Sequence, residues 1–128
     1  MQPEALEEAR DWLERARRDL EAGRRVMAGV DPLPDVAVYH AQQAAEKGFL
    51  AAHDQPFPKT HDLEPLVLAC QETDPKYAQF APAARTLTPY ATQYRYPGGP
   101  IEPEIEDAET ALDLASWIVQ SVEEDLHP

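Results

Sequence analysis

A run of polar side chains between residues 38 and 50 has the spacing of one face of a helix. Tyr39, Gln43 and Lys47 follow one another at intervals of four residues, so in a helix they form one column. The column offers a phenol, a carboxamide and an ammonium group, all of which can hydrogen-bond to a polar ligand. A second column on the same helix contains only small residues, against which another helix can pack closely: Ala37, Ala41, Ala44 and Gly48.

Three nearby side chains are able to bind a metal or transfer a proton, namely His40, His61 and Asp62. Their spacing matches no recognised set of metal ligands, and a packed His40 and a loop-shaping His61 are the simpler interpretation. The Glu-x-x-His pattern of a di-metal bundle occurs only at 124–127, near the C-terminus. The sequence also lacks a glycine-rich phosphate loop, a serine elbow and a Cys–His pair. We therefore predict no metal, no cofactor and no self-contained catalytic residues.

Length and composition are those of an ordinary globular domain. The 128 residues suit a single domain spanning 1–128, and a hydrophobic share of 43% suits a packed core. No apolar run approaches the roughly 20 residues of a membrane span, and the first residues lack the pattern of a signal peptide. The single cysteine, Cys70, excludes an internal disulfide, and we expect it to be an inert core thiol. These features predict a cytoplasmic protein that does not bind membranes.

The charge is strongly negative and unevenly distributed. A net charge of −13 disfavours unassisted binding along a nucleic-acid backbone. Residues 1–30 contain six arginines and seven acids, whereas residues 96–128 contain nine acids and no lysine or arginine. Arg10, Arg17 and Arg24 recur every seven residues, which indicates a basic stripe facing the acidic last helix. A phosphate-binding stripe is the alternative interpretation.

Apolar residues recur at steps of three and four along most of the chain, and no segment alternates with a period of two. We expect Asp35 and Thr60 to cap two of the resulting helices. Pro82 and Pro89 lie within the fourth predicted helix, and Pro89 should kink or end it. The pattern predicts an all-α, up-and-down bundle of four main helices plus one short helix, at 4–29, 35–53, 61–72, 76–93 and 102–126.

Three sequence blocks, at 41–47, 57–63 and 94–97, resemble the HEPN domain family, the higher eukaryote and prokaryote nucleotide-binding domain. The blocks read AQQAAEK, FPKTHDL and YRYP, and they occur in the order and at the spacing of that family. The resemblance implies a helical bundle, often a homodimer, related to the helical domain of kanamycin nucleotidyltransferase. It also implies a small nucleotidyltransferase as partner in a toxin–antitoxin-like module.

Many members of that family are metal-independent ribonucleases that use an arginine followed four to six residues later by a histidine. The histidines of this chain are at positions 40, 53, 61 and 127, and none follows an arginine at that spacing. Without this pair the usual acid–base and charge-stabilising partners are missing. We therefore do not expect the usual ribonuclease activity, and we predict no catalytic residues.

Our leading hypothesis is a non-catalytic nucleotide-binding or adaptor subunit. Arg95 and Lys59 would contact phosphate oxygens, Tyr94 or Tyr96 would stack on a base, and Gln43 would read polar edges. For each residue a structural role, such as hydrogen bonding between helices or between two copies, is the alternative. The full set of ligand-binding candidates is Tyr39, His40, Gln43, Lys47, Lys59, His61, Tyr94, Arg95 and Tyr96.

Two other functions remain open. One is a ribonuclease with a non-standard site, in which His40 or His61 acts as the base and Arg95 or Lys59 steadies the charge on phosphorus. The other is a dimeric interaction module without a small ligand. We expect a homodimer in any case, because amphipathic helices with two tryptophans leave room for an apolar patch beyond one core.

Overall fold

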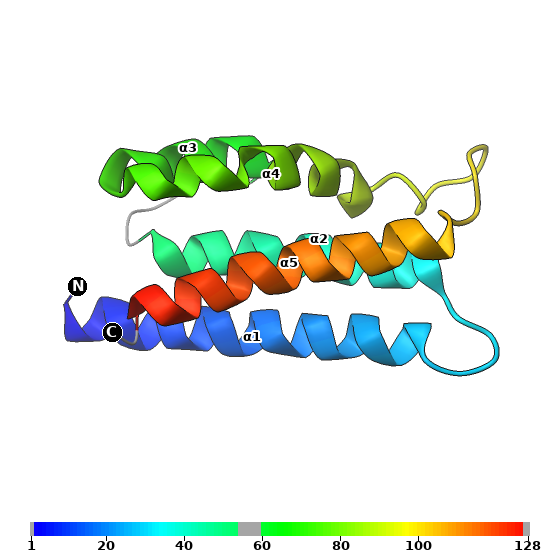
Figure 1. The fold of residues 1–128 in the computed structure, drawn as a ribbon, viewed down its shortest axis with the longest axis horizontal. Coiled ribbons are helices and arrows are strands. Elements are labelled where there is room, and N and C mark those ends of the chain that lie inside the picture. The colour runs from blue at the N-terminus through cyan, green and yellow to red at the C-terminus, as the bar shows by residue number, and fades with distance from the viewer. Residues whose placement is uncertain (1, 54–59, 127–128) are drawn as a thin grey trace.

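The computed structural model describes residues 2–53 and 60–126. Within these two ranges it contains helices and no strand, which confirms the predicted all-α class. Three long helices form the body: α1 (Pro3–Met27), α2 (Pro34–Ala52) and α5 (Ile105–Leu126). α2 runs antiparallel to α1, and α5 runs in the same direction as α2 and packs along it (Figure 1). No helix in the described part of the chain is long and apolar enough to cross a membrane.

A second layer covers the side of α2 that α1 leaves open. It starts with α3 (Leu63–Thr73) and continues through three short helical segments up to residue 91 (Figure 1). These segments pack on α3 and on α2, so α2 lies between two groups of helices. The site residues predicted on α2 are therefore next to both layers.

The column of small residues on α2 is buried, as predicted. Ala37, Ala41 and Ala44 have no exposed surface, and a methyl group added at Gly48 would touch Val119 of α5 at 3.5 Å. α1 also approaches closely, because a methyl group added at Gly23 would come within 2.6 Å of a Leu112 methyl carbon. Small residues at these points let three helices share one apolar core.

The basic stripe of α1 faces the acidic last helix, as the sequence indicated. Arg17 Nη1 lies 2.7 Å from Glu123 of α5, and Arg24 Nη2 lies 3.1 Å from Asp113. The four side chains keep between 29% and 73% of their surface exposed, so each pair adds at most about 1 kcal/mol to stability. Two arginines of the stripe therefore tie α1 to α5.

The predicted fourth helix, 76–93, is broken into three pieces. These are a 3₁₀ helix η1 (Pro75–Phe80), the α-helix α4 (Ala81–Leu87) and a second 3₁₀ helix η2 (Thr88–Ala91). Pro82 and Pro89 each stand at the second position of a new piece. A proline lacks the N–H group that would continue a helix, but the first turn needs no such donor. The prolines thus divide the segment into three successive helical pieces, and helical structure continues through residue 91.

Two predicted caps are wrong. The third helix starts at Leu63 rather than 61, and its cap is Asp62, which accepts a hydrogen bond from the Glu64 N–H at 3.0 Å. Thr60 instead accepts from the Asp62 N–H at 3.0 Å and shapes the preceding turn. The second helix starts at Pro34, so Asp35 lies in its first turn and does not cap it. A proline is suited to a first helical position, which explains the shift.

The last helix is shorter at its start than predicted, since it begins at Ile105 rather than 102. Ile105, its first residue, is 43% exposed. Cys70, in contrast, is buried as predicted, and its Sγ lies 3.6 Å from the Phe49 carbonyl oxygen. Burial raises the pKa of the Cys70 thiol to about 12, which keeps it protonated and unreactive.

Candidate functional site

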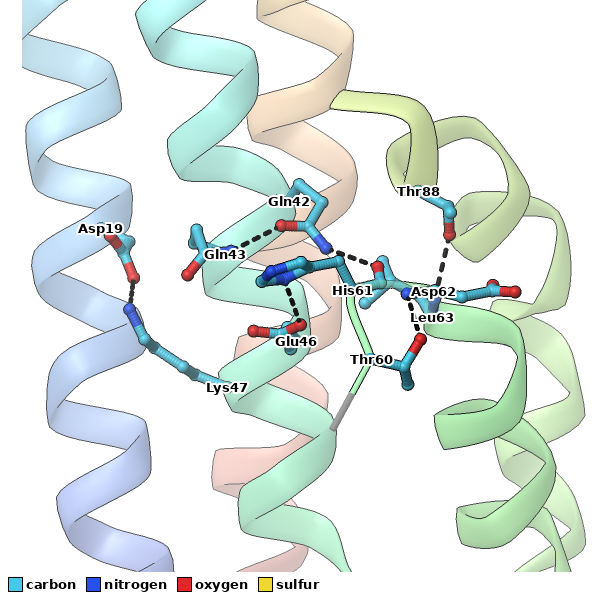
Figure 2. A network of polar contacts seen from close by, with 10 residues as sticks. All are labelled: Asp19, Gln42, Gln43, Glu46, Lys47, Thr60, His61, Asp62, Leu63 and Thr88. Atoms are coloured by element: carbon cyan, nitrogen blue, oxygen red, sulfur yellow. Dashed lines mark hydrogen bonds and ion pairs between the residues drawn. The ribbon is translucent and has the colours of Figure 1, made fainter. Parts of the chain in front are cut away.

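A chain of carboxamide hydrogen bonds connects α2 to the segment that leads into α3 (Figure 2). Gln42 is fully buried, and its Nε2 donates to the backbone oxygen of His61 at 2.8 Å. Its Oε1 accepts from Nε2 of Gln43, also at 2.8 Å. Because a backbone carbonyl only accepts, this contact fixes which end of each amide faces which neighbour. Within the described part of the chain, Oε1 of Gln43 remains available to a ligand.

His61 is held a second time, through its side chain. Its Nδ1 lies 3.2 Å from Oε1 of Glu46, one helical turn beyond Gln42 (Figure 2). The Glu46 side chain is only 13% exposed, whereas the His61 ring is 66% exposed. Burial raises the pKa of the Glu46 carboxyl, and the nearby His61 works in the opposite direction. The result is an exposed imidazole backed by a buried carboxylate.

Two other candidates, His40 and Lys47, are engaged by an acid of α1. Asp19 Oδ1 lies 2.9 Å from His40 Nδ1, and its other oxygen accepts from the Lys47 ammonium group. All three side chains are less than one-third exposed. Asp19 was not among the predicted residues, although it lies on the buried side of α1 between Ala16 and Gly23. An acid on a buried helix side is a signal for a cationic partner.

The other end of the α2 face contacts the tyrosine–arginine block near the start of α5. The Arg95 guanidinium lies over the Tyr39 ring, 4.5 Å from its centroid, in a cation–π contact. The Tyr39 ring also meets the edge of the His40 ring at 5.6 Å. In the part of the chain that the structure describes, Arg95 makes no ion pair. Its charge is therefore free to meet an anion.

The remaining candidates are less closely associated with this face. Tyr94 stacks on Tyr90 at 6.2 Å, a pairing that the sequence analysis missed. Burial raises the pKa of Tyr90, in keeping with a packing role. Tyr96 is 69% exposed and touches no other ring in the described ranges. Lys59 lies outside the described residues.

The three metal-ligand candidates do not come together. His40 contacts Asp19, His61 contacts Glu46, and Asp62 caps α3. Over residues 2–53 and 60–126, no three His, Cys, Asp or Glu side chains gather in a group able to hold a metal ion. His40 instead joins α2 to α1, His61 ties the segment before α3 to α2, and Asp62 caps α3.

The polar face of α2 and the buried alanine column behind it lie within a region that matches a known protein family. A family model of the HEPN domain matches residues 9–125, nearly the whole chain. The chain belongs to the HEPN domain family. No curated protein and no solved structure matched it. The relation of this HEPN domain to the helical domain of kanamycin nucleotidyltransferase therefore remains a prediction.

The described parts of the three sequence blocks of this HEPN domain meet along α2. The first block lies on α2 itself, and Gln42 and Glu46 hold the second block through His61. Tyr39, just before the first block, holds the third block through Arg95. Tyr39 and Glu46 are seven residues apart, which is about 10 Å along a helix axis. A single polar strip of that length thus carries His61 near one end and Arg95 at the other.

Proposed function

We propose that this HEPN domain is a non-catalytic nucleotide-binding subunit whose ligand lies along the polar face of α2. The observation that carries the proposal is the contact between Arg95 and Tyr39, at 4.5 Å. It places a cation that lacks an acidic partner in the described chain on the same helix face as the Gln43 carboxamide and the His61 ring. A cation can bind a phosphate, and carboxamide and imidazole groups can hydrogen-bond to a base edge or a sugar.

The distances along α2 match the size of a nucleotide. About 10 Å separate the Tyr39 and Glu46 positions along the helix axis. A phosphate bound at Arg95 would leave the rest of a nucleotide lying over Gln43 and toward His61. Lys47 contributes less, because Asp19 already neutralises it. The net charge of −13 opposes any anionic ligand, so one arginine gives modest affinity.

The second part of the proposal is an adaptor role, in which a partner would supply the affinity that one arginine does not. We propose a homodimer that assists a small nucleotidyltransferase in a toxin–antitoxin-like module, as the family relation suggests. An exposed apolar side chain outside the nucleotide face, Trp117 at 40%, suits protein contacts. Light scattering at micromolar concentration tests the dimer, and a mass of one chain would contradict it.

Titration calorimetry with ATP and with a single-stranded hexanucleotide RNA tests nucleotide binding. Arg95→Ala should weaken binding about tenfold or more, since hydrogen bonds to charged groups contribute roughly 1.5–3 kcal/mol. Tyr39→Ala should weaken it as well, because the ring holds the guanidinium in place. Arg10→Ala is the matched control, since Arg10 is an exposed arginine in the first half of α1, at the opposite end of the bundle (Figure 1). Equal binding by Arg95→Ala and the parent would remove Arg95 from the site.

One observation favours ribonuclease activity as a second candidate function. The exposed His61 ring backed by the buried Glu46 carboxylate is an arrangement that general bases use. Metal-free cleavage of single-stranded RNA that is lost in His61→Ala would establish it. Cleavage that survives in both His61→Ala and His40→Ala would instead identify a contaminating nuclease.

A further inference from the structure

Four exposed apolar side chains lie in the two connections at the end of the bundle where α2 and α5 begin. Val30 is 95% exposed and Leu33 48%, both in the connection between α1 and α2. Ile101 is 81% exposed and Ile105 43%, at the start of α5. Both segments lie at the same end because α2 and α5 run in the same direction and pack along each other (Figure 1). Single exposed apolar residues are common, but two exposed pairs at the same end of the bundle indicate a contact surface, here called the apolar end.

Acids without an ion-pair partner in the described chain lie in the same two connections and in the helix turns that follow them. Residues 28–35 contain two acids and residues 101–109 contain five, and neither segment has a lysine or arginine. Within the described chain none of these seven carboxylates forms an ion pair. The arginines that end α1 are not available, because Arg24 pairs with Asp113 and Arg25 with Glu21. We call these acids the acidic rim: Asp31, Asp35, Glu102, Glu104, Glu106, Asp107 and Glu109.

Helix stability explains only part of the acidic rim. Glu106 and Asp107 lie in the first turn of α5, where negative charge stabilises a helix. Asp31 and Glu102 lie outside the helices, so this effect gives no reason for them. Clustered like charges without partners lower stability. An additional role is therefore needed for charges placed beside exposed Val30 and Ile101.

We propose that the apolar end and the acidic rim together bind a cationic amphipathic segment of a partner protein. Its apolar side chains would cover the four exposed residues, and its lysines or arginines would meet the rim. A second copy of this chain does not suit the surface, because two acidic rims would repel each other. Nucleic acid is excluded by the same negative charge. Apart from Asp35, which lies one turn before Tyr39 on α2, none of these residues belongs to the polar face of α2, and the proposal does not depend on nucleotide binding.

Fluorescence anisotropy with a designed peptide tests the proposal on the full chain. The probe is a helical peptide about 18 residues long, which is five turns, with leucine on one face and lysine on the other. We expect binding that weakens as salt increases, and no binding of the same peptide with glutamate in place of lysine. Equal binding of both peptides, or no binding of the lysine peptide, would overturn the proposal.

Two comparisons between variants distinguish binding at this surface from a general attraction between the negative protein and the positive peptide. Val30→Ser with Ile101→Ser should weaken binding about tenfold, whereas Leu68→Ser, at an exposed position on α3, should not change it. Glu102→Lys with Glu104→Lys should also weaken binding about tenfold. Glu7→Lys with Glu14→Lys changes the net charge equally but lies on α1, so it should weaken binding less than about twofold. Equal losses in the two charge-changed proteins would refute the proposed surface, and circular dichroism melting checks that each variant is folded.

Discussion

Gln42 is the single polar side chain in the fully buried set of residues that the structure describes. Its carboxamide contacts the His61 carbonyl on one side and Gln43 on the other, and both hydrogen bonds are 2.8 Å long. A buried amide of this kind is stable only when its groups have partners. Gln42 therefore fixes both the path of the chain into α3 and the orientation of the Gln43 amide.

Gln42→Met should lower the free energy of unfolding by about 1–3 kcal/mol. Methionine fills nearly the same volume, but it leaves the His61 carbonyl and the Gln43 amide without a partner. Gln93→Met, at an exposed position, should stay within about 0.5 kcal/mol of the parent. Urea denaturation measures both. An unchanged midpoint for Gln42→Met would show that water replaces the amide at no cost.

The Glu46 carboxyl makes stability depend on pH. Burial raises its pKa above 4.5, the value assigned to an unperturbed glutamate, so the folded state takes up this proton at a higher pH than the unfolded state. Stability from this group is therefore greatest at low pH, and it is lost as pH rises through the folded pKa. The stability of Glu46→Gln relative to the parent should rise as pH is increased from about 4 to about 8.

The contact with His61 gives a control for this pH dependence. His61 lowers the pKa of Glu46, so removing the ring with His61→Ala should move the transition to higher pH. Chemical denaturation of Glu46→Gln, in the parent and in the His61→Ala background, measures the shift. A relative stability that falls with rising pH would mean that pairing with His61 outweighs burial.

Sequence reasoning found the positions on α2 but not most of their partners. The column of Tyr39, Gln43 and Lys47 follows from helical spacing alone. The contacts of Asp19 with Lys47 and of Arg95 with Tyr39 join residues 28 and 56 positions apart. Such contacts depend on how helices pack, which local spacing does not specify. The buried Asp19 was nevertheless a usable signal.

At the scale of helices, Gly23 and Gly48 both lie against side chains of α5, but replacing each by alanine should change the stability in opposite directions. At Gly48 the added carbon meets ordinary contacts of 3.5 Å, so Gly48→Ala should stabilise the protein by about 0.5–1 kcal/mol through helix propensity. At Gly23 it would lie 2.6 Å from the buried Leu112 side chain. Gly23→Ala should therefore destabilise by roughly 1–2 kcal/mol, because overpacking outweighs the propensity gain. Thermal unfolding of the two variants compares them directly.

If Gly48→Ala proved less stable than Gly23→Ala, the close packing of Gly23 in α1 against Leu112 in α5 would be contradicted. Gly23→Ala with Leu112→Ala offers a further check, since the smaller side chain removes the clash. The double variant should lose less stability than the two single changes predict together.

Helix boundaries were the least predictable part of the fold. Thr60 and Asp62 are both good capping residues, two positions apart. The Leu63 N–H donates to the Thr88 hydroxyl at 3.1 Å, and this contact to η2 helps to place the start of α3 (Figure 2). The sequence around residue 60 contains no information about Thr88. The break of the fourth helix, by contrast, was foreseeable from Pro89, although its 3₁₀ geometry was not.

For the whole molecule, the balance of charge predicts how salt changes stability. The net charge is −13, and the acidic rim lacks cationic partners within the described chain. Raising NaCl from about 0.02 M to about 0.3 M shortens the range of charge repulsion to a few ångströms. The melting temperature should rise by roughly 3–5 °C, which corresponds to about 1 kcal/mol for a chain of this size.

Glu102→Lys with Glu104→Lys should reduce the salt effect on melting, because it removes part of the repulsion at the rim. Calorimetry at two salt concentrations compares this variant with the parent. A melting temperature that falls with salt would mean that ion pairs such as Arg17–Glu123 outweigh the repulsion.

The first turn of α1 and the last turn of α5 lie together at the end of the bundle away from the start of α2 (Figure 1). A biosensor surface coupled through either of these helix ends would therefore hold the molecule in the same orientation. In both cases the opposite end of the bundle, with the connections that contain the exposed Val30 and Ile101, would face the solution. Tethering by each end in turn thus gives two independent attachments that expose one and the same face.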